Sequence, residues 1–210
     1  MRGGGQKFQF CIDGDFFEAR ASFRSESSAI LARNLFEPLW QSHLYFEEIR
    51  SQLLMELQPI EGMSDLGANL AAEMLNCESV AVHIRRGDYI SSEYAATGHI
   101  ACDLEYYQRA LAGLRCTVCN PKLFIFSDDP VWTRQHLKLD APMVHVCYHG
   151  LDTAYNDLRL MSYCRHNIIA NSSFSWWGAW LGQYEHKIVY ASKYWFLQKN
   201  MGNADTVPPE

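Results

Sequence analysis

The segment 83–88, with the sequence HIRRGD, gathers side chains that suit an anionic ligand. Arg85 and Arg86 each present a rigid fork of N–H donors that matches phosphate oxygens and stays charged at any working pH. Gly87 lets the backbone turn sharply or approach a ligand closely. Taken alone, the segment has two interpretations, because the arginines could bind a ligand or could simply pair with nearby carboxylates.

Two further polar clusters follow apolar runs, at 127–129 and at 171–175. Asp128 and Asp129 could accept hydrogen bonds from the edge of a guanine or coordinate a metal. Asp129 precedes Pro130, so we expect it to cap a helix, which leaves Asp128 as the freer carboxylate. The serine cluster opens a predicted helix, whose first N–H groups favour an anion; the alternative is that the serines only cap that helix.

Five short apolar runs predict the strands that position these clusters, and helical patterns separate them. This alternation predicts an α/β fold with a Rossmann-like, doubly wound parallel sheet. Because the carboxyl ends of parallel strands share one edge, we expect the three clusters to meet in one crevice. The predicted strands are 79–84, 122–126, 143–147, 167–170 and 187–191.

The first third of the chain carries a weaker pattern. Residues 8–12 alternate like a strand, and 35–57 read as an amphipathic helix with Ile49, Leu53 and Leu57 on its buried face. Residues 58–69 are the best linker candidate. We therefore expect two parts, with 1–69 ending in the linker and 70–210 as the Rossmann-like domain.

Composition limits the function classes. The chain has 210 residues, and its net charge of −6 argues against a nucleic-acid binder that relies on a basic surface. No apolar run approaches the roughly 20 residues that cross a bilayer. Neither a Gly-x-Gly-x-x-Gly loop nor a Walker-type loop is present, which argues against a dinucleotide dehydrogenase and a P-loop enzyme.

No Asp-x-Asp pair offers the usual metal site of a transferase, so we expect a metal-free mechanism without a cofactor. Trp176, Trp177 and Trp180 fall at helical spacing and favour core packing over a sugar platform.

Taken together, three motifs resemble those of the α-1,2-fucosyltransferase family (glycosyltransferase family 11). They read HIRRGDY at 83–89, FSDD at 126–129 and LMSYCRHNIIANSSFSWWGAWL at 160–181. The segment LWQSHLYF at 39–46 is also similar to the one that precedes the nucleotide domain in that family. The third motif is long and specific, and the resemblance runs from about residue 36 to the end.

The resemblance implies a GT-B glycosyltransferase of which this chain is the donor-binding half. It implies transfer of L-fucose from GDP-β-L-fucose to the 2-hydroxyl of a galactoside, with inversion and without a metal. Arg85 would stabilise the departing diphosphate, and Asp88 would act as base or orient Arg86. Other donor contacts that we expect, at positions matching the family's motifs or beside them, are His83, Arg86, Asp128, Asp129, Asn171, Ser172, Ser173 and Phe174.

The chain departs from the family pattern at its start, where the Gly-Gly-x-Gly-Asn-Gln loop is missing. The resemblance therefore implies an amino-terminally truncated chain that lacks most of the acceptor domain, with 1–69 as the remnant of that domain plus the linker. Three readings stay open: a fucosyltransferase, a non-catalytic GDP-sugar-binding module, or a transferase of another GDP-sugar such as GDP-mannose. The expected partners are GDP-fucose and a galactose-terminated glycan, with a membrane reached only through a segment absent from this chain. The compartment stays open between cytoplasm or membrane in a bacterium and the Golgi lumen in a eukaryote.

Overall fold

A seven-stranded, mostly parallel sheet forms the centre of the computed structural model, which describes residues 9–12, 15–18, 48–58, 62–87, 101–146 and 154–192. The strand order is β2-β1-β7-β6-β3-β4-β5. The strands are β1 (Gln9–Ile12), β2 (Asp15–Glu18), β3 (Ser79–Ile84), β4 (Lys122–Ser127), β5 (Met143–Val146), β6 (His166–Ile168) and β7 (Ile188–Tyr190).

The five strands β3 to β7 are all parallel and confirm the predicted Rossmann-like α/β fold. The chain runs outward from β3 through β4 to β5, then returns to the other side of β3 and runs outward again through β6 to β7. The order in which strands are added to the sheet therefore changes direction between β3 and β6. In open α/β sheets, ligands collect at such a switch point, outside the carboxyl ends of the strands.

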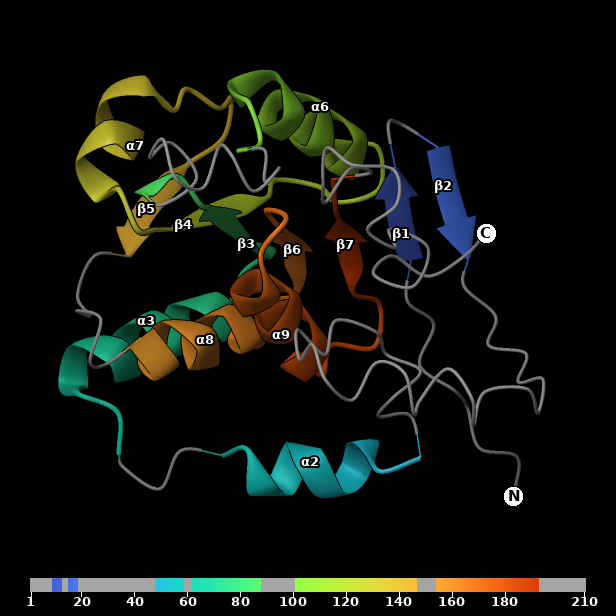
Figure 1. The fold of residues 1–210 in the computed structure, drawn as a ribbon, viewed down its shortest axis with the longest axis vertical. Coiled ribbons are helices and arrows are strands. Elements are labelled where there is room, and N and C mark those ends of the chain that lie inside the picture. Colours follow the sequence, from blue (N-terminus) through green and yellow to red (C-terminus); the bar gives the residue numbers. More distant parts are fainter. Residues whose placement is uncertain are drawn as a thin grey trace.

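Helices cover both faces of this sheet (Figure 1). One face carries α6 (Leu104–Arg115) and α7 (Pro130–His136), and the other carries α3 (Asp65–Leu75), α8 (Ala154–Tyr163) and α9 (Ser173–Leu181). A further helix, α2 (Arg50–Glu56), lies outside α8 and α9 as an outer layer (Figure 1).

The core follows the alternation of β3, whose residues are all buried, as expected for a central strand covered on both faces. Val80, Val82 and Ile84 pack under α6, whereas Ala81 packs with α3 and α8. The helix caps agree with the sequence pattern, since Asp103 accepts from the Tyr106 N–H at 2.7 Å. The tryptophans also behave as predicted, because Trp176 and Trp180 are buried in a core cluster that α9 shares with the sheet and with α2.

The amino-terminal part differs from the prediction in two places. Residues 65–69 belong to α3 and not to a linker; Ser64 caps this helix by accepting from the Gly67 N–H at 3.2 Å. In α2, Leu53 and Leu54 pack against the core, whereas Ile49 and Leu57 are about half exposed. The predicted face is thus confirmed at Leu53 and wrong at Ile49 and Leu57, because a short outer helix buries only the residues that meet the cluster of Trp176 and Trp180. Residues 35–47 lie outside the described residues.

The strand predicted at 8–12 is confirmed as β1, which pairs in parallel with β7 and antiparallel with β2. These two strands therefore extend the sheet at its β7 edge (Figure 1). The division into parts at residue 69 stays a prediction.

Candidate active site

The carboxyl ends of β3, β4 and β6 bring the three predicted polar clusters to one edge of the sheet. Arg85 to Gly87 follow β3, Asp128 and Asp129 follow β4, and residues 171–173 follow β6. Since β3 lies between β4 and β6, the arginine turn sits at the middle of this edge and beside the switch point.

Asp128 holds the arginine turn in place. Its two carboxylate oxygens accept from the backbone N–H groups of Arg86 and Gly87, each at 2.9 Å, and one lies 3.3 Å from Arg85 Nη1. The expectation that Asp128 is the freer carboxylate was therefore wrong, because the turn after β3 folds back onto it. A Cβ at Gly87 would lie 3.0 Å from the Asp128 carboxylate, so glycine allows this close approach.

Asp129 has the predicted capping role, accepting from the Trp132 N–H at 3.0 Å at the start of α7. It also lies 3.8 Å from Arg86 Nε. The Arg86 guanidinium stacks over the Trp132 ring, 3.4 Å from the ring centroid. Both arginines thus pair with local carboxylates, as one of the two readings held, and these contacts fix the direction in which each fork points.

The first turn of α9 forms the opposite wall of the switch point. Ser172 occupies the cap position without a side-chain cap bond, and no acidic side chain stands in the first turn. The Ser175 hydroxyl lies 3.1 Å from the Ala170 carbonyl and 3.2 Å from that of Ser172, so its one proton can stabilise the turn through either acceptor. Because helix starts leave N–H groups without intrahelical acceptors, this turn can bind an anion.

His83 lies at the end of β3, just before the arginine turn, and contacts the first turn of α9. Its side chain is 3% exposed, and its ring centroid lies 5.5 Å from that of Phe174 in α9. Burial, together with the charge of Arg85, lowers the pKa of His83 from about 6.5 to about 3, so the imidazole is neutral at physiological pH. Its Nδ1 is buried and has no hydrogen-bond partner among the residues that the structure describes. A neutral, rigidly held imidazole of this kind can offer one hydrogen bond to a ligand.

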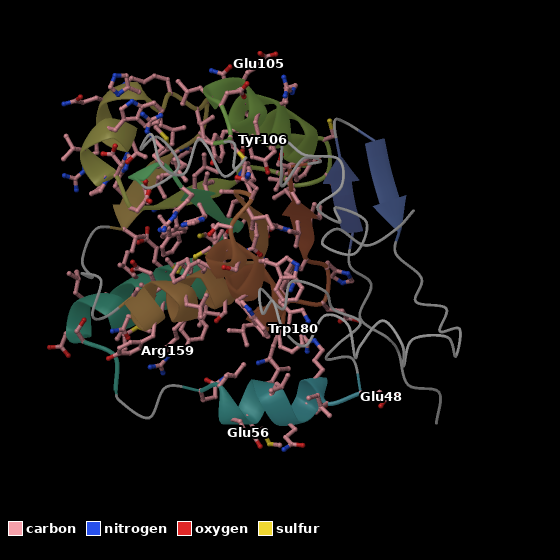
Figure 2. The ribbon with its side chains drawn as sticks, in the orientation of Figure 1. Glu48, Glu56, Glu105, Tyr106, Arg159 and Trp180 are labelled. Atoms are coloured by element: carbon pink, nitrogen blue, oxygen red, sulfur yellow. The ribbon has the colours of Figure 1, made fainter. Side chains whose placement is uncertain are left out.

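Two tyrosines link the strands at this edge through hydrogen bonds, and the sequence did not identify either of them as part of the site. The Tyr107 hydroxyl donates to the His83 carbonyl at 3.0 Å, and the Tyr106 hydroxyl lies 2.7 Å from the Ile169 carbonyl and 3.1 Å from that of Tyr190. Tyr106 lies on the side of α6 that faces the sheet (Figure 2). The first turn of α6 thus ties β3, β6 and β7 at their carboxyl ends. The only sequence signal was the cap at Asp103, which fixes where this turn begins.

The structure therefore brings His83, Arg85, Arg86, Asp128 and Asp129 together at the carboxyl edge. Phe174 joins them through its ring contact with His83. Asn171, which is buried, has its Oδ1 3.7 Å from Cys102 Sγ at the start of α6. Asp88, the candidate base, lies outside the described residues.

A cavity of about 440 Å³ lies among the helices on one face of the sheet. Its walls come from the ends of α2, α3, α8 and α9, with Leu57, Leu75, Tyr163 and Leu181 among the lining residues. None of its lining residues belongs to the three polar clusters. Within the described ranges, no group of three or more potential ligands could hold a metal ion. No helix in the described part of the chain is long and apolar enough to cross a bilayer.

Comparison with protein families decides the assignment. The model for glycosyl transferase family 11 matches residues 11–203, which is most of the chain. The chain belongs to glycosyl transferase family 11. The resemblance inferred from the three motifs is thereby confirmed.

Curated relatives of this family 11 chain come from bacteria and mammals. It is 36% identical to an α-1,2-colitosyltransferase of Escherichia coli over 175 residues, which cover 82% of this chain and 60% of that protein. It is 37% identical to the O-antigen biosynthesis glycosyltransferase WbnK of Escherichia coli over 60% of this chain and 41% of that protein. It is 30% identical to the galactoside 2-α-L-fucosyltransferase Sec1 of Mus musculus over 49% of this chain and 28% of that protein. The chain thus spans 60% of the length of the first of these relatives and less of the other two.

Proposed function

We propose that this family 11 chain transfers L-fucose from GDP-β-L-fucose to the 2-hydroxyl of a galactoside, with inversion and without a metal. The observation that carries the proposal is the meeting of the arginine turn, the first turn of α9 and the neutral His83 at the switch point. These groups offer positive charge and N–H donors, which are what a nucleotide diphosphate requires. The relative named a galactoside 2-α-L-fucosyltransferase supports the choice of sugar and linkage.

In the proposed reaction, the acceptor 2-hydroxyl oxygen attacks the anomeric carbon of fucose. The bond from that carbon to the β-phosphate oxygen breaks, and GDP leaves with the bonding electron pair. The hydroxyl proton passes to a base. Arg85 would stabilise the negative charge that grows on the leaving diphosphate, which is the role of a preorganised cation in a transition state.

His83 is poorly suited to be that base. Its pKa of about 3 lies far below neutral pH, and an efficient general base has a pKa near the working pH. We assign it instead to donor binding, through one hydrogen bond from a neutral ring held against Phe174. Asp88 stays the candidate base, with orientation of Arg86 as the alternative role.

A second candidate donor deserves the same test. A relative that matches 82% of this chain is named an α-1,2-colitosyltransferase. Transfer of a colitosyl group in place of a fucosyl group would use the same diphosphate contacts. Competition between the two activated sugars, measured as the ratio of kcat/KM values, separates the candidates.

Calorimetric titration with GDP in the presence of EDTA tests the proposal. We expect micromolar binding by the wild type and a loss of about tenfold to 100-fold in Arg85→Ala, since a charged hydrogen bond contributes about 1.5–3 kcal/mol. The matched control is Arg115→Ala, which removes another arginine paired with an aspartate, at the last residue of α6. Equal affinity of Arg85→Ala and wild type would contradict the role of Arg85. Turnover with a β-galactoside then separates an enzyme from a module that only binds the donor.

A further inference from the structure

Helix α9 connects the proposed phosphate site to a pair of cations at its other end. The helix has nine residues and is about 13 Å long. Its first turn forms one wall of the switch point, and its last turn reaches the layer between the sheet and α2. Figure 2 shows Trp180, near this end, in the space between α9 and α2.

Lys187 and Arg50 satisfy the carbonyl groups at this end of α9. Lys187 Nζ donates to the carbonyl of Ala179 and, at 2.9 Å, to that of Gly182. Arg50 Nη2 donates to the Trp180 carbonyl at 3.0 Å, and its guanidinium lies 4.9 Å from the centre of the Trp180 ring. Helix ends leave such carbonyls without intrahelical donors, and cations are favoured there.

The two cations come from elements far apart in the sequence. Lys187 immediately precedes β7, whereas Arg50 begins α2. The end of α9 is therefore held to the sheet on one side and to the outer helix on the other. In its middle, Gly178 lets the helix approach Met161 of α8, where an added Cβ would lie 3.0 Å from the methionine side chain. These contacts restrict both the tilt of α9 and its sliding along its own axis.

We propose that Lys187 and Arg50 are positioning residues for the donor-phosphate site, acting through the axial position of α9. The inference rests on the proposed function, since it assumes that the first turn of α9 contacts the donor. A rigid helix transmits a shift at its end directly to its start. A misplacement of about 1 Å at a reacting group can cost about 100-fold in rate, so a small shift of α9 is enough to matter.

The burial of Lys187 supports a positional role. The side chain is 2% exposed, and burial, with the charge of Arg50 nearby, lowers its pKa to about 7. An apolar side chain of similar length would avoid this desolvation, yet it would leave two carbonyls of α9 without their donor. The lysine therefore supplies directional hydrogen bonds that packing alone does not.

Lys187→Met and Arg50→Met test the inference by GDP titration and by donor kinetics. We expect GDP affinity to fall about tenfold in Lys187→Met and several-fold in Arg50→Met, with the KM for the acceptor unchanged. The double variant should lose less than the product of the single losses, because both residues hold the same helix end. The control is Leu114→Ala, which removes a buried side chain at the far end of α6. We expect this variant to have a lower Tm and the GDP affinity of the wild type.

Wild-type affinity in a folded Lys187→Met variant would overturn the inference. If that variant does not fold, Arg50→Met decides, since it lies on the outer helix; unchanged GDP affinity there would also overturn it. Equal weakening in Leu114→Ala would mean that affinity follows stability and not the position of α9. Absence of GDP binding by the wild type would instead refute the proposed function.

Discussion

Substitution of Asp128 by asparagine tests whether this carboxylate builds the arginine turn. In the wild type, two backbone N–H groups donate to its oxygens and Arg85 lies 3.3 Å away. The asparagine keeps one acceptor oxygen but turns an NH₂ group toward the other N–H, and it removes the negative charge. A hydrogen bond to a charged group contributes about 1.5–3 kcal/mol, and the partly exposed pair with Arg85 adds at most about 1 kcal/mol.

We therefore expect Asp128→Asn to lower the free energy of unfolding by about 2–3 kcal/mol. For a chain of this size each kcal/mol moves Tm by about 2–4 °C, so Tm should fall by about 4–12 °C. Thermal unfolding followed by circular dichroism measures the shift, and GDP titration should show weaker binding because the turn loosens. The control is Asp140→Asn, whose carboxylate is 95% exposed and pairs with Arg115, and which should change stability by less than about 0.5 kcal/mol. A Tm for Asp128→Asn equal to that of the control would refute the reasoning.

Two further predictions follow from the same site. The pKa of His83 is about 3 in the folded chain and near 6.5 in the unfolded chain, so its contribution to stability is complete above pH 6.5 and declines as the pH falls toward 3. Between these pH values, the free energy of unfolding in urea should rise with pH less steeply in His83→Gln than in the wild type, by up to about 1.4 kcal/mol per pH unit. Parallel pH dependences of the two proteins would contradict this. Gly87→Ala should cost about 1–3 kcal/mol and weaken GDP binding, because the new methyl group displaces the Asp128 carboxylate. Gly62→Ala, where an added Cβ meets nothing within 4 Å, should leave both quantities unchanged.

Local features of this chain could be read directly from the sequence. The five parallel strands were placed within one or two residues, because short apolar runs between helical patterns identify strands. The cap at Asp129 was predicted correctly, since capping depends only on residues three positions apart. The start of α3 was missed because it falls within the predicted linker at 58–69, although Ser64 and the later apolar spacing predict a helix start.

The candidate site was predictable in its parts but not in its connections. The sequence placed polar clusters after β3, β4 and β6, and a parallel sheet necessarily brings such ends to one edge. It did not reveal that Asp128 bonds to a turn about 40 residues earlier, or that Tyr106 spans the ends of β6 and β7. These contacts depend on strand order and on the direction of each side chain, which no local pattern encodes.

The sequence by itself determined the fold class, the residue types at the carboxyl edge and the family. Periodicity and capping are local, and the family motifs are contiguous, so each can be read along the chain. The tertiary structure decided which carboxylate holds the arginine turn, that His83 is buried and neutral, and that Lys187 and Arg50 meet at the end of α9. These properties arise from burial and from contacts between distant segments, because only packing sets the dielectric environment and the neighbours of a charged group.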